Sequence, residues 1–239
     1  MPHRVFSVEE VAGYLHLTVA DVHRRVKDGE IPFEKRGERI VFRKKDIDIW
    51  ASQRILGLPE QRLAEYHLKS TREIRKLLPQ EALLPEMLER GAVDSGMTAK
   101  TKASVLRDLV ALAEKTWQVN DAKDLLASVE AREKLGSTAL PGGLALPHPR
   151  FHEPYLFASS FMVVGRPIQE IHFGASDGQP TDLFFLICCQ DDRLHLLTLA
   201  RLCLMAKKTD VIAQLRLAPD AQTMRDCLIS AEQVILALK

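Results

Sequence analysis

The stretch Gly142-Gly143-Leu144-Ala145-Leu146-Pro147-His148-Pro149-Arg150 decides how the C-terminal part of the chain folds. Its apolar run, Leu144 to Pro147, is long enough for a buried strand and too short for a helix. Because Pro147 ends the run, His148 should lie where a strand meets a surface loop, held in place and still reachable. Neutral imidazole is a nucleophile near neutral pH, so the position suits proton or phosphoryl transfer.

Three further motifs flank this stretch. They are Glu130 to Thr138, Asp177 to Leu186 and His195 to Ala200. In this order the four motifs resemble the enzyme IIA domain of the fructose/mannitol class of the bacterial sugar phosphotransferase system. The Asp-x-Gln-Pro-x-Asp-Leu stretch also resembles the nitrogen-related regulatory branch of that class, which is the nearest match. The resemblance covers residues 84–239.

The resemblance implies a site for a phosphoryl group. In the family, the histidine at the position of His148 accepts phosphate from a small HPr-like phosphocarrier protein. A second histidine and an arginine lie beside the phosphoryl group, and by motif position these are His195 and Arg132. A guanidinium donates hydrogen bonds in a planar fork, which suits phosphate better than the ammonium of lysine.

One residue of the motif departs from the family pattern. Family members often carry glycine or alanine after the active histidine, whereas this chain has Pro149. Proline removes one backbone N–H that could hold the phosphate. Arg150 either compensates for this loss or contacts a partner.

The C-terminal sequence alternates between helical and strand patterns. The expected helices are Lys100–Trp117, Asp121–Glu133, Leu194–Ala206, Asp210–Leu215 and Ala221–Leu228, and the expected strands are Leu144–Pro147, Phe157–Val164 and Leu183–Cys189. Irregular alternation of this kind predicts a layered α/β (α+β) domain with a mixed sheet, and the family resemblance implies the same fold.

The N-terminal segment has the pattern of a DNA-binding module. Ser7 and Glu10 form a capping box for a helix over 8–15, and Thr18 caps a second helix over 19–27. A turn with Gly37 at its tip and a strand over 40–43 follow, then a helix from about Lys45. The segment resembles the excisionase-like, MerR-related winged helix-turn-helix family.

That resemblance implies that the second helix enters the major groove and the wing touches the DNA backbone. By position the candidates are His23, Arg24, Arg25 and Lys27 on the helix and Lys35, Arg36 and Arg39 on the wing. Acidic and basic residues are nearly balanced over 1–50, so a single module should bind DNA weakly. The alternative is a relic of the fold that is used for protein contacts.

The sequence therefore predicts three parts: a DNA-binding domain over 1–52, a helical connector over 53–83 and an enzyme IIA domain over 84–239. The connector should start a helix at Pro59 and expose it to solvent. Its narrow apolar stripe is Leu63, Tyr66, Leu68, Ile74, Leu77 and Leu78, ahead of Pro79. Such a helix is either a spacer or a contact in a homo-oligomer, which would help a weakly charged DNA-binding head through avidity.

Composition restricts the remaining choices. The net charge of +1 gives no global nucleic-acid or membrane signature. The chain shows no apolar run long enough to cross a bilayer and no signal peptide, and its four cysteines suit buried thiols, so we expect a cytoplasmic protein. A metal site built on His148 and His152 finds no second ligand pair, so neither a metal nor a cofactor is expected.

The leading hypothesis is a regulatory phosphocarrier of the nitrogen-related phosphotransferase system, with His148 phosphorylated by an HPr-like protein and coupled to DNA binding or transcription. Whether it counts as a phosphotransferase-type enzyme stays open. One alternative is a transcription factor whose enzyme IIA-like domain senses partners without being phosphorylated. Another is the enzyme IIA component of fructose or mannitol uptake. Both alternatives use the same motifs.

Overall fold

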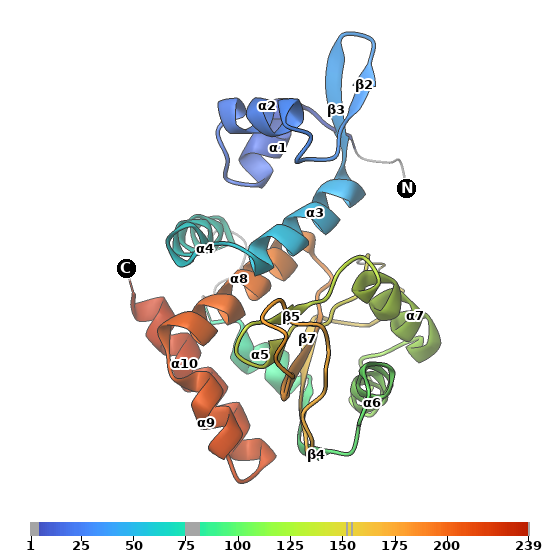
Figure 1. The fold of residues 1–239 in the computed structure, drawn as a ribbon, viewed down its shortest axis with the longest axis vertical. Coiled ribbons are helices and arrows are strands. Elements are labelled where there is room, and N and C mark those ends of the chain that lie inside the picture. The colour runs from blue at the N-terminus through green and yellow to red at the C-terminus, as the bar shows by residue number, and fades with distance from the viewer. Residues whose placement is uncertain (1–4, 75–81, 152, 154, 239) are drawn as a thin grey trace.

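The N-terminal segment forms a helix-turn-helix with a two-stranded wing (Figure 1). The computed structural model describes residues 5–74, 82–151, 153 and 155–238. Expectations for Leu77, Leu78, Pro79 and His152 therefore lie outside the described residues. The elements of the segment are β1 (Val5–Phe6), α1 (Val8–Tyr14), α2 (Val19–Lys27), β2 (Glu34–Arg36), β3 (Arg39–Arg43) and α3 (Lys44–Leu56). The strands pair in the order β1-β3-β2, antiparallel throughout.

Side-chain caps start the first two helices, as expected. The Ser7 backbone N–H donates to Glu10 Oε2 at 2.8 Å, and the Glu10 N–H donates to Ser7 Oγ at 3.2 Å. Thr18 Oγ1 accepts from the Asp21 N–H at 3.0 Å. These bonds satisfy backbone donors that have no partner within their own helix. Val11, Val22, Phe42 and Ile47 are buried in an apolar core that continues into the C-terminal part of the chain.

The connector helix α4 (Glu60–Ile74) is not the exposed helix that the sequence predicts. It lies along α8 (Asp192–Lys208), and Leu63, His67, Thr71 and Ile74 are buried. The expectation was wrong because polar residues of α4 point inward. His67 Nε2 accepts from Arg201 Nε at 3.0 Å, so a stripe counted from apolar residues alone underestimates the buried face.

A buried ion pair lies under this helix. Arg201 and Glu232 are both 0% exposed, and Arg201 Nη1 donates to Glu232 Oε1 at 2.6 Å. The same carboxylate accepts the backbone N–H groups of Leu83 at 2.8 Å and Leu84 at 3.0 Å. A protein interior tolerates charged groups when they are paired and when their other polar atoms also form hydrogen bonds.

The C-terminal domain is built on a mixed five-stranded sheet, which confirms the predicted α/β class. The strands pair in the order β4-β7-β8-β6-β5, with β4·β7 and β6·β8 parallel and β7·β8 and β5·β6 antiparallel. The remaining elements are α5 (Leu84–Glu89), β4 (Ala92–Met97), α6 (Lys102–Glu114), α7 (Ala122–Glu133), β5 (Ala139–Leu140), β6 (Leu144–Ala145), β7 (Phe161–Pro167), β8 (Leu183–Cys188), α9 (Val211–Leu217) and α10 (Ala221–Ala237).

Helices cover both faces of this sheet (Figure 1). Alternate residues of β8 enter two separate cores: Phe185 and Ile187 pack with α5, α8 and α10, whereas Phe184 and Leu186 pack with α6 and α7. A strand buried on both faces reads as a continuous apolar run. This explains why β8 was visible in the sequence.

Other boundaries differ from the expectations. β7 starts at Phe161, because Phe157 instead forms an isolated bridge with Val119. The edge strands β4 and β5 had no counterpart in the sequence reading. β4 has the sequence AVDSGM and is largely half-buried, so its strand conformation depends on pairing with β7 rather than on local preference.

The turn before β6 requires glycine. Gly143 has a φ of +86°, and a Cβ atom there would lie 2.3 Å from Arg216 Nη2 and 2.6 Å from Asp182 Oδ1. Arg216 binds both oxygens of Asp182, with Nε to Oδ2 at 2.6 Å and Nη2 to Oδ1 at 2.8 Å. The glycine thus lets the chain pass beside this ion pair. Arg216 Nη2 also donates to the Gly142 carbonyl at 2.7 Å, so this arginine joins the turn before β6 to the residue preceding β8.

The structure also bears on two expectations from composition, that the cysteines are buried thiols and that no segment crosses a bilayer. All four cysteines are free thiols; Cys188, Cys189 and Cys203 are buried and Cys227 is half-buried. Burial raises the pKa of the Cys203 thiol to about 12, so it is inert. Within the ranges that the structure describes, none of the helices has both the length and the apolar composition needed to cross a bilayer.

His67 should make the stability of the protein depend on pH. Burial, and to a smaller extent the charge of Arg201, lowers the pKa of His67 to about 4, whereas a histidine in an unfolded chain titrates near pH ~6.5. As the pH falls from about 6.5 toward 4, the unfolded chain takes up a proton that the folded protein does not, so stability is lost. Between pH 7.5 and pH 5 this difference amounts to roughly 2 kcal/mol.

Urea unfolding of the wild type and of His67→Gln at these two pH values measures the effect. The variant should lose less free energy of unfolding on acidification by about that amount, because all other groups titrate alike in both proteins. His172→Gln, which removes an exposed histidine, should behave like the wild type. Equal losses in the wild type and in His67→Gln would contradict the prediction.

Candidate functional site

His148 follows β6 and is held from two sides. The carbonyl of Pro147 accepts from the Ile187 N–H of β8 at 2.9 Å, and His148 is only 1% exposed. His148 Nδ1 lies 2.8 Å from the carbonyl oxygen of Leu146, which can only accept. This contact assigns the proton to Nδ1 and leaves the lone pair on Nε2. The nucleophilic atom of His148 is therefore Nε2.

Arg132 meets that nitrogen. It lies in the last turn of α7, is 1% exposed, and its Nε donates to His148 Nε2 at 2.9 Å. Its Nη1 donates to the Gly136 carbonyl at 3.0 Å, which orients the guanidinium. Burial lowers the pKa of Arg132, and the nearby Glu133 carboxylate acts in the opposite direction. An arginine nonetheless stays charged, so a cation lies next to the nucleophile.

His195 completes the group from a third element. It lies in the first turn of α8 and is 2% exposed, and its ring centroid is 4.6 Å from that of His148. Asp191 caps this helix by accepting from the Leu194 N–H at 2.9 Å. The structure therefore brings together all three residues expected at the site, although Arg132 and His195 are separated by more than sixty residues in the chain.

The sequence reading missed the residues that support Arg132. Glu133 accepts from the backbone N–H of Thr138 at 3.0 Å and from its Oγ1 at 2.7 Å, and it pairs with Lys102 Nζ at 2.9 Å. These contacts close the loop that carries Gly136 against α7. Glu133 and Thr138 lie within the Glu130 to Thr138 motif, so the motif itself contained the signal.

The residues after His148 point elsewhere. The Arg150 N–H donates to the Ser128 carbonyl at 3.1 Å, and the Arg150 guanidinium stacks on the Phe151 ring at 5.1 Å from its centroid. Arg150 therefore does not replace the donor that Pro149 lacks. In the parts of the chain that the structure describes, no three His, Cys, Asp or Glu side chains gather where they could hold a metal ion.

The basic residues of the N-terminal module form a separate surface. Six of the seven DNA-binding candidates are exposed, three on α2 and three on the wing: His23, Arg24, Lys27, Lys35, Arg36 and Arg39. Arg25 is the exception. It is 6% exposed and its Nη1 donates to Glu30 Oε2 at 2.8 Å, so it stabilises the module from inside and the expectation that it faces DNA has to be corrected.

Acidic neighbours reduce the charge of this surface. Arg24 pairs with Asp21 within α2, and Glu34 pairs with both Arg36 and Arg43 on the wing. Exposed pairs of this kind contribute little to stability, but they lower the local positive potential. The structure thus shows where acidic side chains offset the basic ones on this surface.

Comparisons with known proteins agree with the two folds. Residues 86–231 match the family described as phosphoenolpyruvate-dependent sugar phosphotransferase system, EIIA 2, and residues 5–55 match a helix-turn-helix domain. A nitrogen regulatory protein of Bradyrhizobium diazoefficiens is 31% identical over 157 residues, covering 65% of this chain and 94% of the relative. One from Pseudomonas aeruginosa is 28% identical over 151 residues, covering 62% and 96%.

A solved structure is similar over the same region. The crystal structure of nitrogen regulatory protein IIA-Ntr from Neisseria meningitidis is 25% identical in sequence and matches with a TM-score of 0.54, covering 62% of this chain and 99% of that one. The family match alone spans more than half of the chain. The protein therefore belongs to the EIIA 2 family of the phosphoenolpyruvate-dependent sugar phosphotransferase system and carries a helix-turn-helix domain ahead of that region.

Proposed function

We propose that the protein is a regulatory phosphocarrier in which His148 Nε2 accepts a phosphoryl group from an HPr-like phosphocarrier protein. The observation that carries the proposal is the bond from Arg132 Nε to His148 Nε2 at 2.9 Å, with the His195 ring beside it. Phosphoryl transfer requires a nucleophile and positive groups around the phosphoryl oxygens, and a second imidazole can supply a further hydrogen bond to them. The relatives named nitrogen regulatory proteins favour regulation over sugar uptake.

The transfer needs no net proton movement in this chain. The lone pair of His148 Nε2 attacks phosphorus, the P–N bond to the imidazole of the donor breaks, and that imidazole leaves with the bonding electron pair. His148 keeps its proton on Nδ1, where the Leu146 carbonyl stabilises the ring as it becomes positively charged. Arg132 releases Nε2 and donates instead to the phosphoryl oxygens, and His195 donates to another of them.

The regulatory part of the proposal involves the N-terminal module. Its exposed cations on α2 and the wing support DNA binding, and a phosphoryl group adds a charge near −2 elsewhere in the same chain. The domain limits that we propose remain 1–52 for DNA binding, 53–83 for the connector and 84–239 for the phosphocarrier. Oligomerisation would supply the avidity that the weakly charged module lacks.

His148→Ala should take up no phosphate. Incubation with a phosphorylated HPr-like protein, read as acid-labile phosphate and as the intact mass, measures uptake. His172→Ala is the matched control, because His172 is exposed and lies outside the site, and it should be labelled like the wild type. Full labelling of His148→Ala would overturn the assignment. The assignment would also fail if neither the wild type nor a variant with an opened site, such as Lys44→Glu with Lys45→Glu, took up any label.

Arg132→Ala should slow phosphate uptake on an intact fold. Loss of a charge-assisted bond at a buried site should cost roughly 1.5–3 kcal/mol of transition-state stabilisation, which is about one to two decades in rate. Arg132→Lys should be slowed less. Arg107→Ala is the control, since that side chain is exposed on α6, and its rate should be unchanged. Transfer rate and melting temperature are measured together, and an unchanged rate for Arg132→Ala would remove Arg132 from the site.

Lys27→Gln and Arg36→Gln should each weaken DNA binding to all sequences. Each removes one exposed cation from the proposed surface, so the slope of log K against log salt should fall by about 1 per lost phosphate contact. Titrations of a labelled random-sequence duplex over a range of salt concentrations give both quantities. Lys115→Gln removes an exposed cation from the C-terminal domain and should change neither. Affinities and slopes equal to the wild type in all three variants would refute this surface.

A further inference from the structure

The phosphoacceptor site is closed in the full chain. His148, Arg132 and His195 are each at most 2% exposed. A phosphoryl donor protein must bring its own phosphohistidine to bonding distance of His148 Nε2. Some part of this chain must therefore move aside, and the contacts around the site indicate which part.

Helix α3 of the N-terminal module contacts each of the three segments that supply a site residue. Gln53 Nε2 donates to the carbonyl of Leu135, which follows Arg132, at 3.4 Å. Lys45 Nζ lies 2.9 Å from Glu153 Oε1, in the loop that follows His148. Lys44 pairs with Asp192, which lies in the same helical turn as His195. One helix thus contacts all three segments that supply the site residues.

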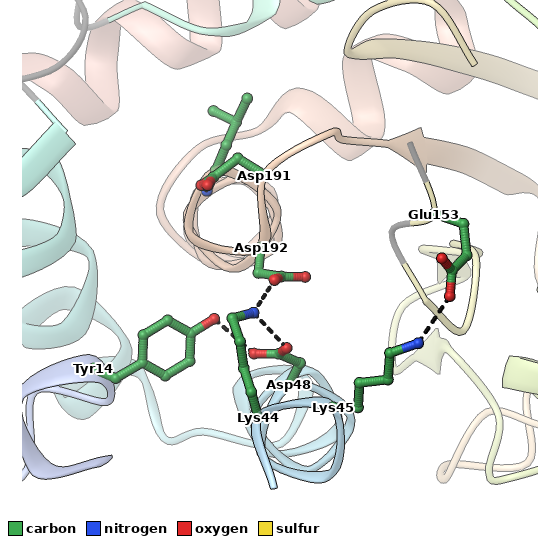
Figure 2. Close-up of polar contacts among 8 residues, drawn as sticks. Tyr14, Lys44, Lys45, Asp48, Glu153, Asp191 and Asp192 are labelled. Carbon is green, nitrogen blue, oxygen red and sulfur yellow. Dashed lines mark hydrogen bonds and ion pairs between the residues drawn. The ribbon is translucent and has the colours of Figure 1, made fainter. Parts of the chain in front are cut away.

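Figure 2 shows the polar contacts of this interface. Lys44 lies between Asp192 of α8 and Asp48 of its own helix, and the Asp48 distance is 2.7 Å. Asp48 also accepts from Tyr14 Oη at 2.7 Å, so α1 supports the same group. Burial and the charge of Asp192 raise the pKa of Asp48. The cluster is mostly shielded from water, where ion pairs respond strongly to loss of one partner.

A second contact reaches the loop of the phosphoacceptor. Lys45 Nζ lies 4.8 Å from the centroid of the Phe151 ring, which also stacks with Arg150. Phe151 is three residues from His148. The module therefore touches the loop that a donor protein would have to approach, through the ammonium group of Lys45.

The surface for DNA faces away from this interface. In Figure 1 the hairpin of β2 and β3 extends from the end of the molecule opposite the C-terminal sheet, whereas α3 lies beside α8. Ile47, Ala51 and Ile55 of α3 are buried as well, in an apolar cluster that holds residues of both the module and α8. One helix thus serves both the fold of the module and the closure of the site.

We propose that α3 occupies the face through which a phosphoryl donor protein reaches His148, so that docking of the N-terminal module and phosphotransfer exclude one another. This inference rests on the proposed function. Transfer from the donor then proceeds only through the fraction of molecules in which the module has released. By linkage, anything that holds the module on the C-terminal domain slows phosphorylation, and the bound donor favours release.

Charge reversal at the interface tests the proposal. Lys44→Glu with Lys45→Glu breaks both ion pairs and should raise the initial rate of labelling by a phosphorylated HPr-like protein about tenfold, if roughly a tenth of the wild-type molecules are open. Lys100→Glu with Lys115→Glu changes the net charge equally at exposed positions of the C-terminal domain, and its rate should stay at the wild-type value. Circular dichroism checks that the variants are folded.

A cross-link tests the opposite direction. Lys45→Cys and Glu153→Cys, in a Cys227→Ser background, place two thiols where the ion pair lies, and a short bismaleimide joins them. The bridged protein should lose transfer at least tenfold relative to the same variant capped with N-ethylmaleimide. Equal rates in the bridged, capped and charge-reversed proteins would overturn the proposed closure. If the charge-reversed protein also takes up no label, the proposed function fails instead, so the two failures are distinguishable.

Discussion

The arrangement of the whole chain depends on the buried pair of Arg201 and Glu232. Its two members are fully enclosed, and between them they bind α8, α10, the backbone at Leu83 and Leu84, and His67 of α4. Removing one partner from such a pair typically costs about 3–5 kcal/mol, because the other charge is left buried. The pair therefore fixes the connector on the C-terminal domain, and the connector limits where the N-terminal module lies.

The reactive site is set up by backbone geometry before any partner arrives. The Leu146 carbonyl assigns the tautomer of His148, and the Gly136 carbonyl orients Arg132. The Leu146 carbonyl directly follows strand β6, and the Gly136 carbonyl lies in the loop between α7 and β5. Preorganised groups of this kind need not rearrange during the reaction. Burial of the site keeps water away from the reacting groups. It also means that the approach of a phosphoryl donor to His148 is the step that can be controlled.

Apolar runs and helix caps were enough to predict the mixed α/β domain and the helix-turn-helix. The grouping of Arg132 and His195 around His148 was implied by the resemblance to enzyme IIA domains. Pairing across the fold explains what was missed. β4 becomes a strand only beside β7, and α4 is buried through polar residues that pair with Arg201. Arg25 reads as an exposed cation in the sequence, yet Glu30 draws it inside. The outcomes for β4 and α4 depend on neighbours distant in the chain, whereas that for Arg25 depends on a side chain five residues further on.

Because α4 is buried against α8, the start of the family similarity differs from the start of the unit that folds together. Similarity to the EIIA 2 family begins at residue 86, but a fragment cut there would lose His67 and Thr71 as partners of Arg201. It would also expose apolar surface that Leu63 and Ile74 now cover. The smallest fragment of this chain that keeps its apolar core buried therefore includes α4, and it begins well before the region that the relatives share.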